Sequence, residues 1–388
     1  MLNQNTKLTL RYSFINRNLL IILYGLINLA FVYKYGIRQN YINIYILLFA
    51  YTSFLIIFYY LYTYKKKLQL KNWHYISLVI LFFLSIIGIN LYVDGTVLNV
   101  DRWSAMDVSI NALLNGNYPY TAIDHLGGRT SNLPALLILG IPFYLLHDVG
   151  YIQAFSFLLF AYIVFISFTN NKQRFFAILL LLSAPSFMWE VYVKSDLMSN
   201  LIFVLSFIVI IHKQNTNNYL SNPYLTGFLS AFIALTRVVV IIPLTIFFMK
   251  NFYENSTTKK LQFLLTAILT SGILIGLVVM NCPDYETLIQ YNPLLLQTHY
   301  TPLLVNLISL ALPIYVSFKS KNFDQIILFS IIILLLPIAY SFINALVLYG
   351  FNNTIISNAF DISYFGILIP FIIYSLTTGI ERVDTVIT

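Results

Sequence analysis

The sequence predicts an all-α protein, a polytopic bundle of transmembrane helices. Apolar residues make up 59% of the 388 positions, charged residues make up only 9%, and the mean hydropathy is +0.79. A soluble chain carries about a quarter charged residues, so a soluble globular domain is excluded. The apolar residues form continuous runs of roughly 16 to 22, which fits membrane-crossing helices, whereas a barrel needs alternating segments of about ten residues.

Charge and cysteine content narrow the class. The formal net charge of +8 indicates, in a membrane protein, basic residues that hold cytoplasmic loops against an anionic leaflet. The single cysteine, Cys282, excludes an intramolecular disulfide and any CxxC motif. The first apolar run begins near Leu19 without a small-residue cleavage site, so we expect it to be the first span and not a signal peptide.

Ten apolar runs approach the roughly 20 residues that cross a bilayer. They are residues 17–34, 41–62, 75–93, 151–169, 174–190, 197–212, 261–280, 302–318, 323–344 and 362–379. A further apolar run, residues 132–147, is short and contains Pro134 and Pro142. It therefore predicts a re-entrant or surface-lying helix.

Residues 224–249 are long enough for one span but carry Arg237 at the centre. An arginine in mid-bilayer costs on the order of 3 kcal/mol or more. Two short helices, residues 224–236 and 238–249, avoid this cost if they meet at Arg237 on one membrane face. This hairpin also keeps Lys250, Lys259 and Lys260 inside, as the positive-inside rule prefers.

With the N-terminus inside, this arrangement places sixteen of the 22 Lys and Arg residues in the cytoplasm. We therefore expect about twelve spans with both termini inside (N-in/C-in). Residues 1–388 then form a single membrane domain. Its parts are three N-terminal spans in 17–93, an outer loop region in 94–150, core spans in 151–249 and C-terminal spans in 250–388.

Acidic residues contribute little to orientation, yet they gather on the outer side of this topology. Ten of the fourteen are predicted there: Asp94, Asp101, Asp107, Asp124, Asp148, Glu190, Asp196, Asp284, Glu286 and Asp361. The concentration predicts an outward-facing polar site, although exposed loops also carry acids that have no functional role.

The longest polar stretch, residues 94–131, contains an amphipathic helix over residues 102–115. Its apolar side chains recur at helical spacing, so we expect the helix to lie against the outer leaflet. Asn115-Gly116 and the following Pro119 predict its end. Asp101 falls at its N-terminus, where two interpretations remain open: a helix cap, or a general base held at the membrane surface.

Three segments of this chain resemble GT-C glycosyltransferases, in particular the mannosyltransferase-like members that use polyprenyl-phosphate sugars. The first segment combines an acidic residue, an Ala/Leu-rich helix and the motif Gly-x-x-Pro-Tyr. Its residues here are Asp101, Ala112, Leu113, Leu114, Gly116, Pro119 and Tyr120. Residues 133–147 are similar to the helix that follows this segment in the family. The second is residues 183–207, which place Asp196 in the second outer loop, and the third is the glycine-containing helix 227–237, which ends in Thr-Arg. In the third segment, Ala231 stands where the family has glycine.

The resemblance implies transfer of a sugar from a polyprenyl-phosphate carrier to an acceptor hydroxyl on a glycan or lipid. The implied setting is cell-envelope glycan assembly at the outer face of a bacterial-type plasma (inner) membrane. Phosphate is the leaving group, so no nucleotide site is required, and GxGxxG, P-loop and DxD motifs are absent. We expect Asp101 to be the base, with Asp94 as second choice. No cofactor is required and no nucleic acid partner is expected; a divalent metal held by Asp101, Asp196 and His125 stays open.

The leaving phosphate needs cations where negative charge develops. Arg237 is the first candidate, with a membrane-interface anchor as its alternative role. Arg102, Arg129 and Lys194 are the other outer-face cations. Arg102 is also a candidate ion-pair partner of Asp101, and Lys194 a candidate partner of Asp196.

The remaining substrate-binding candidates are polar or aromatic. Asp107 and His125 are candidate contacts for sugar hydroxyls. The alternative for Asp107 is a place on a solvated helix face, and the alternative for His125 is a loop histidine without a function. Trp103, Tyr118 and Tyr120 offer ring faces for sugar stacking. The alternative is that they belong to the aromatic belt that membrane proteins commonly have at the bilayer interface. Residues 281–301 form an outer loop on the acceptor side.

Two other classes share parts of this pattern. A polymerase of lipid-linked oligosaccharides has a similar span count but does not require the spacing from Asp101 to Tyr120. A lipid-oligosaccharide flippase usually shows internal repeats and charges in mid-membrane, and the sequence has no internal repeat.

Overall fold

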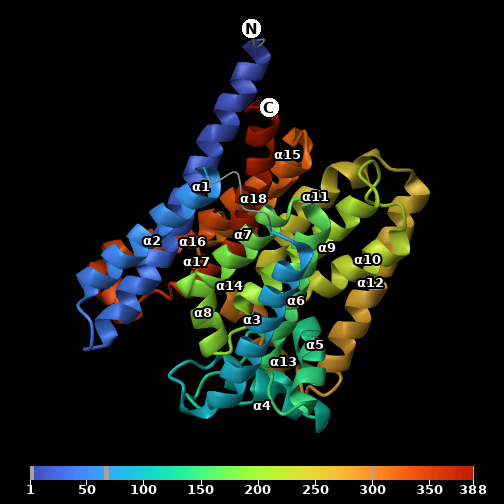
Figure 1. The fold of residues 1–388 in the computed structure, drawn as a ribbon. Helices are drawn as coiled ribbons and strands as arrows, with labels where there is room; N and C mark the ends of the chain where they lie inside the picture. Colours follow the sequence, from blue (N-terminus) through green and yellow to red (C-terminus); the bar gives the residue numbers. More distant parts are fainter. Residues whose placement is uncertain (1–3, 65–69, 299–300, 388) are drawn as a thin grey trace.

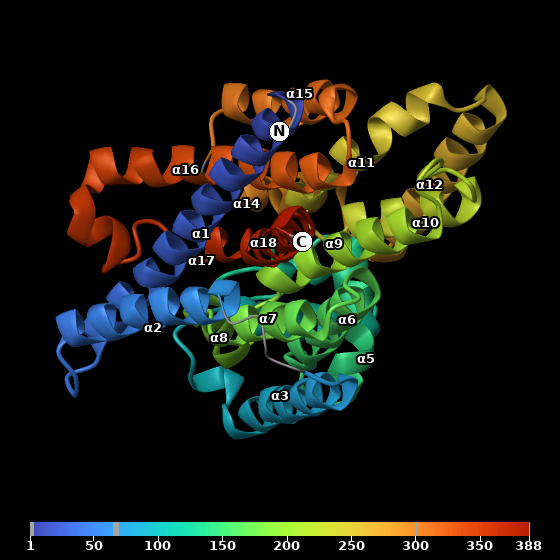
Figure 2. The same cartoon turned by 45° about the horizontal axis from the view of Figure 1, so that its top comes forward.

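The computed structural model describes residues 4–64, 70–298 and 301–387, and these contain helices and no strands, which confirms the all-α class. Lys65, Lys66 and Lys67, which we expect in a cytoplasmic loop, lie outside the described residues. Figures 1 and 2 show one bundle whose first helices lie along one side.

Ten helical elements lie in the described part of the first half of the chain. These are α1 (Gln4–Arg38), α2 (Ile44–Tyr64), α3 (Asn72–Tyr92), η1 (Gly95–Val97), α4 (Arg102–Leu114), η2 (Pro119–Thr121), α5 (Pro134–Leu145), α6 (Tyr151–Ser167), α7 (Asn171–Leu182) and α8 (Pro185–Tyr192). The second half contains α9 (Leu197–Gln214), α10 (Pro223–Ala234), η3 (Val238–Val240), α11 (Ile241–Glu254), α12 (Thr257–Val279), α13 (Tyr285–Gln290), α14 (Pro293–Thr298), α15 (Leu303–Lys319), α16 (Phe323–Ile355), α17 (Ser363–Gly366) and α18 (Ile369–Ile387).

Within the described part of the chain, six helices are long and apolar enough to cross a membrane: α1, α2, α3, α9, α12 and α16. The bent pair of α7 and α8 brings the number to seven. Helices α5, α6, α10 and α15 and the segment Ser363–Thr378 are apolar but shorter. The structure therefore has the character of a helical membrane protein, and the twelve crossings stay a prediction.

Helix α9 lies at the centre of the bundle. Of its 18-residue apolar window, 78% is buried inside the protein, compared with none for α2 and 17% for α3 and for α12. The peripheral helices leave large apolar side chains such as Phe49, Ile80 and Leu265 exposed. Apolar surfaces of this kind are typical of a membrane or protein interaction face. The buried helix α9, in contrast, is the central element of the bundle, and the polar end described below lies at its N-terminus.

The predicted span over residues 174–190 is wrong as a single helix, because α7 and α8 meet at an angle of 60°. Pro185 begins α8 and has no backbone N–H, so it cannot continue the α7 ladder. Two carbonyls left open at the break accept hydrogen bonds from tyrosines: Tyr24 Oη donates to Leu180 O at 2.6 Å and Tyr51 Oη to Ser183 O at 3.1 Å. The break is thus satisfied internally by α1 and α2.

The helix predicted over residues 102–115 is present as α4, but its apolar face does not lie against lipid. Met106 and Ile110 are buried, and they pack against α5 so closely that a Cβ on Gly140 would lie 2.3 Å from Met106 Cε. Gly116 follows the helix with φ of 73°, as its predicted end requires. The hydrophobic spacing therefore predicts the helix, but Met106 and Ile110 pack against α5 where contact with lipid is predicted.

Helix α16 extends to Ile355, beyond the predicted end at residue 344, and bends at Gly350, which has φ of 74° and ψ of 169°. The predicted outer loop 281–301 contains two short helices, α13 and α14. Helix α5 has only 12 residues, as expected for a segment that does not cross. The hairpin at residue 237 is also present: α10 ends at Ala234, and η3 and α11 follow Arg237.

Gly227 sets the approach of α10 to α12. A Cβ at this position would lie 2.6 Å from the backbone oxygen of Phe263, which has no side-chain freedom with which to move away. We expect Gly227→Ala to lower the free energy of unfolding by about 1–3 kcal/mol, the usual cost of overpacking. Gly276→Ala in α12 is the matched control, because its Cβ would meet nothing within 4 Å. Thermal unfolding in detergent measures both, and equal melting temperatures for the two variants would contradict this packing.

Candidate functional site

Polar residues from loops far apart in the sequence meet at one end of the bundle, the end that carries α4 and α13 in Figure 1. Arg237 and Asp196 form an ion pair there, as do Arg102 and Asp361. Lys194 pairs with Asp148 at the same end. All these residues, apart from Arg237 at the hairpin tip, belong to loops predicted on the outer side. We refer to them, together with the residues bonded to them, as the polar end.

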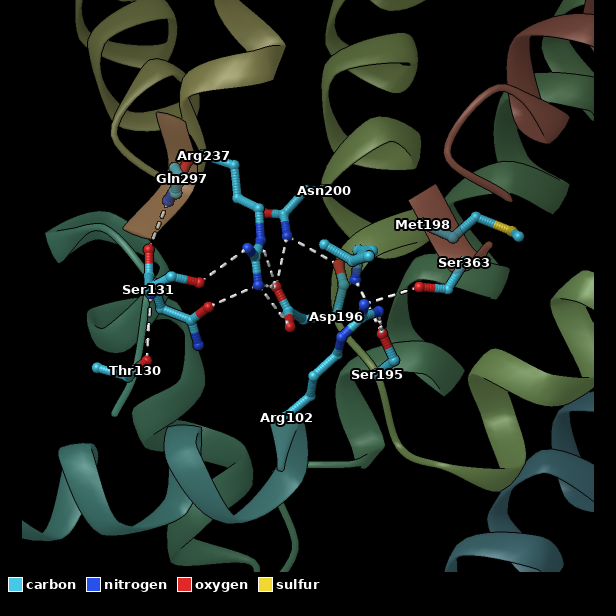
Figure 3. A network of polar contacts seen from close by, with 12 residues as sticks. Arg102, Thr130, Ser131, Ser195, Asp196, Met198, Asn200, Arg237, Gln297 and Ser363 are labelled. Carbon is cyan, nitrogen blue, oxygen red and sulfur yellow. Dashed lines mark hydrogen bonds and ion pairs between the residues drawn. The ribbon is translucent and has the colours of Figure 1, made fainter. Parts of the chain in front are cut away.

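Arg237 is the centre of the first network, drawn in Figure 3. The residue is extended between α10 and η3, and only 7% of its surface is exposed. Its Nε and Nη2 donate to Asp196 Oδ2 at 2.9 and 2.7 Å, and Nη2 also donates to Asn132 Oδ1 at 2.8 Å. Asn200 Nδ2 donates to the same carboxylate at 2.9 Å. The guanidinium is therefore held inside the protein and does not reach the membrane interface as an anchor.

The segment before α5 is fastened to the hairpin tip. Leu133 N donates to Thr236 O at 3.3 Å and Ala135 N to Leu235 O at 3.0 Å. From α14, Gln297 Nε2 donates to Ser131 O at 2.5 Å, while its Oε1 accepts from Val238 N at 2.8 Å. Loop 281–301, α5 and the hairpin are thus joined into one unit.

Arg102 begins α4 and organises the second network. It pairs with Asp361, donates to Ser195 Oγ at 2.9 Å and to Ser363 Oγ at 2.7 Å, and lies 3.8 Å from Glu190 Oε1. Burial alone would raise the pKa of Asp361, but the Arg102 charge and the Ser363 hydrogen bonds hold that pKa below its usual value. Of the two roles left open for Arg102, an ion pair with Asp101 is not formed, because its partners are Asp361 and Glu190. Ser195 and Asp196 are consecutive, so the two networks join there.

Lys194 pairs with Asp148 and not with Asp196, which overturns the expected pairing within one loop. Its backbone has φ of 54°, an uncommon value for a residue with a side chain. Its ammonium lies 5.5 Å from the Trp103 ring, and Trp103 Nε1 donates to Asp148 Oδ1 at 2.8 Å. A Cβ on Gly95 would lie 2.2 Å from that ring, so the backbone of Gly95 covers one part of the half-buried tryptophan. Sugar stacking by Trp103 stays a prediction.

The loop before Arg129 is held in a fixed shape. Asp124 Oδ1 accepts from Leu126 N at 2.7 Å and Gly128 N at 3.0 Å, whereas its buried Oδ2 has no partner among the described residues. His125, an exposed residue, bridges Ser104 Oγ at 2.5 Å and Leu98 O at 2.7 Å. Arg129 is exposed and lies 4.5 Å from the centroid of the Tyr291 ring.

Asp101 differs from Asp148, Asp196 and Asp361, each of which forms an ion pair. It occupies the cap position of α4, but its side chain makes no capping hydrogen bond and has no hydrogen bond or ion pair to another residue in the described chain. Burial, assisted by the nearby charge of Asp124, raises its pKa although Arg102 acts in the opposite direction. Its carboxylate is thus free to accept a proton.

The other predicted residues also lie at this end, but they differ in burial and in hydrogen bonding. Asp107 is partly buried on another side of α4, and burial, with Asp148, raises its pKa. Asp94 is exposed, and hydrogen bonds from Thr96 lower its pKa. Tyr118 and Tyr120 are 3% exposed and pack edge to face with centroids 5.3 Å apart, and the hydroxyl of Tyr120 has no partner among described residues.

In the part of the chain that the structure describes, no group of three His, Cys, Asp or Glu side chains is arranged to hold a metal ion. Asp196 is bound to Arg237, and His125 is bound to Ser104 and Leu98 O. Asp101, Asp196 and His125 are therefore not gathered into one cluster among the described residues.

Sequence reasoning missed Lys34 of α1. It is 2% exposed, and its ammonium lies 5.8 Å from the Tyr35 ring without a hydrogen bond or ion pair in the described residues. Asp361, Arg38 and Arg102 are close enough to act on it electrostatically. A lysine at the end of an apolar run was a usable signal, because ionisable residues inside membrane helices commonly mark function.

An apolar groove of about 870 Å³ lies between α1, α2, α3 and α8, and its lining includes Tyr35, the residue that follows Lys34. Phe31, Tyr35 and Trp189 form one wall. The Trp189 ring lies 5.7 Å from the guanidinium carbon of Arg102, so this wall separates the groove from the polar end. The polar end offers charged groups and the groove an apolar lining, on the two sides of this wall. Comparison of the chain with protein-family models, curated proteins and solved structures gave no match.

Proposed function

We propose that this protein is a GT-C type glycosyltransferase that moves a sugar from a polyprenyl-phosphate carrier to an acceptor hydroxyl. The observation that carries the proposal is Asp101, a carboxylate with a raised pKa and no bonding partner among the described residues, at an end where Asp148, Asp196 and Asp361 are all paired. A carboxylate that is free to accept a proton is what activation of a hydroxyl requires.

The reaction assigned to this end is a displacement at the anomeric carbon of the donor. The acceptor oxygen forms a bond to that carbon while its proton passes to the Asp101 carboxylate. The bond between the anomeric carbon and the phosphate oxygen breaks, and its electron pair leaves with the polyprenyl phosphate. Positive groups near that phosphate stabilise the charge that develops on it.

Lys34 and Arg129 are the cations best suited to this task, because neither has a carboxylate partner in the described chain. Arg237 and Arg102 are already neutralised by Asp196 and Asp361. The apolar groove that includes Tyr35, next to Lys34 in the chain, suits the isoprenoid tail, since its lining is mostly apolar and includes residues of the peripheral helices α2 and α3.

The topology proposed with this function has about twelve spans, both termini inside, and the polar end at the outer face of a bacterial-type plasma membrane. The convergence of the predicted outer loops at one end of the bundle supports this orientation. The observed hairpin at Arg237, which keeps Lys250, Lys259 and Lys260 on one side, also supports it.

Lys34→Gln should raise the apparent KM for the lipid donor about tenfold or more, because one charge-assisted contact to phosphate contributes roughly 1.5–3 kcal/mol. Lys71→Gln is the matched control, since Lys71 is an exposed lysine before α3. Steady-state transfer at varied donor concentration measures both. An unchanged donor KM in Lys34→Gln would remove Lys34 from the donor site.

A donor panel tests the function class. Purified protein in lipid should transfer labelled sugar from a polyprenyl monophosphate sugar and not from a nucleotide sugar. Polymerisation of a diphosphate-linked oligosaccharide would instead favour the polymerase class. Movement of lipid-linked sugar across the bilayer without transfer would favour a flippase.

A further inference from the structure

A second polar cavity, of about 610 Å³, lies at the opposite end of the bundle from the polar end. Helix α9 shows the separation, because Asp196 precedes its first residue and Lys213 of the cavity lies in its last turn. An 18-residue helix spans roughly 27 Å, so the two places are about one helix length apart. In the predicted topology this cavity opens to the cytoplasmic side.

Three lysines line this cavity: Lys213, Lys250 and Lys321. None of them forms an ion pair in the described part of the chain, and Lys213 Nζ donates a hydrogen bond to the backbone oxygen of Ser167 at 3.4 Å. Two acids, Glu254 and Asp324, also line the cavity. The three lysines outnumber the two acids, so the lining carries a net positive charge that a bound anion would neutralise.

The uncharged lining complements these cations. Side chains of Asn217, Asn322 and Ser320 line the same space, and they suit hydroxyl or phosphate oxygens. Asn322 also caps α16, because its Oδ1 accepts a hydrogen bond from Gln325 N at 3.0 Å. The positive N-terminal end of α16 therefore lies at the cavity. Helix N-termini favour anions, which adds to the attraction of the lysines.

The walls are rigid enough to preform a site. His212 stacks on Phe323 with centroids 3.9 Å apart and planes within 3°, and its Nδ1 lies 3.1 Å from Tyr219 Oη. Tyr374 Oη lies 3.0 Å from Ser167 Oγ. These contacts join α6, α9, α16 and α18 around the cavity, so binding requires little reordering of its walls.

We propose that this cavity binds a phosphate ester through Lys213, Lys250 and Lys321. Its volume falls within the range of about 300–1,000 Å³ for small-molecule sites, well above the roughly 30 Å³ of one water, so it accommodates the phosphate together with a polar substituent. Such a group is presented either by the headgroup of an anionic lipid or by a soluble phosphate compound. The proposal concerns a different end of the molecule and does not depend on sugar transfer.

The test compares two variants that remove equal charge from the same predicted face. One is Lys213→Gln/Lys250→Gln/Lys321→Gln. The control is Lys259→Gln/Lys260→Gln/Lys319→Gln, whose lysines do not line the cavity. Native mass spectrometry from mixed phosphatidylglycerol and phosphatidylcholine bilayers counts retained lipid, and calorimetry with glycerol phosphate measures soluble binding. Circular dichroism shows whether each variant is folded. If the triple cavity variant is misfolded, the single variant Lys321→Gln replaces it, because Lys321 is exposed.

A lipid-headgroup site predicts that the wild type and the control retain phosphatidylglycerol and that the cavity variant retains at least tenfold less. A soluble-ligand site predicts glycerol phosphate binding that is at least tenfold weaker in the cavity variant only. If the cavity variant and the control match the wild type with both probes, the cavity is not a phosphate site and the proposal is overturned.

Discussion

Asp101→Asn is expected to lower the rate of sugar transfer by a factor of about 10²–10⁴, because the amide cannot accept the acceptor's proton. Donor affinity should stay unchanged, since Lys34 and the groove are separate from this carboxylate. The raised pKa of Asp101 also predicts the pH profile. Activity should fall as pH drops through that pKa, at a higher pH than for an ordinary aspartate. Single-turnover transfer between pH 4 and pH 9 measures both effects.

Asp107→Asn is the comparison on the same helix, because Asp107 also has a raised pKa but lies near Asp148. As a candidate sugar contact and not the base, it should lower transfer far less than Asp101→Asn does. The stability of Asp101→Asn separates loss of chemistry from misfolding. A carboxyl with a raised folded-state pKa destabilises the protein at pH values above that pKa, and the destabilisation disappears as pH falls. The asparagine variant should therefore melt at or above the wild-type temperature at neutral pH. Near-normal transfer by Asp101→Asn, or a stronger loss in Asp107→Asn, would show that the base lies elsewhere.

Arg237→Ala is expected to lower the free energy of unfolding by about 3–5 kcal/mol, since it leaves the carboxylate of Asp196 buried without its partner. The side chains of Arg237 and Asp196 are only 9% and 3% exposed, so water cannot replace the lost contact easily. The loss also frees Asn132, which holds the segment before α5. Thermal or denaturant unfolding in detergent, followed by circular dichroism, measures the change.

The double variant Arg237→Leu/Asp196→Leu provides the control. It removes both charges, so its loss should be smaller than that of either Arg237→Ala or Asp196→Ala alone. If Arg237→Ala unfolds within about 1 kcal/mol of the wild type, the pair is weakly coupled and Arg237 again becomes a candidate for the leaving phosphate.

Local patterns in the sequence predicted several elements of this fold. The hydrophobic spacing and the Asn-Gly signal gave α4 and its end, and the cost of burying an arginine gave the hairpin at Arg237. Both depend on residues close together in the chain. The break between α7 and α8 was missed, although Pro185 was visible, because a membrane helix tolerates a proline when neighbours satisfy its backbone. Here those neighbours are Tyr24 and Tyr51, more than 130 residues away in the sequence.

The sequence predicts which residues belong to the candidate site, but it does not predict which of them form ion pairs with one another. Asp101, Arg102, Lys194, Asp196 and Arg237 do lie at one end. Their partners were mistaken, because sequence proximity suggested Lys194 with Asp196, whereas packing joins Lys194 to Asp148 and Asp196 to Arg237. Charges a few residues apart on a tight turn point in different directions, and only the tertiary arrangement shows which ones meet.

The most direct test of the central claim is transfer by the purified protein in lipid vesicles, with a radiolabelled polyprenyl-phosphate sugar and host envelope glycans as acceptor. Wild type, Asp101→Asn and Asp107→Asn are compared at equal protein. The proposed function predicts label in the acceptor with wild type and Asp107→Asn, and none above background with Asp101→Asn. Equal transfer by all three proteins would contradict the assignment of the base, and no transfer from any polyprenyl-phosphate sugar by the folded wild type would contradict the proposed activity.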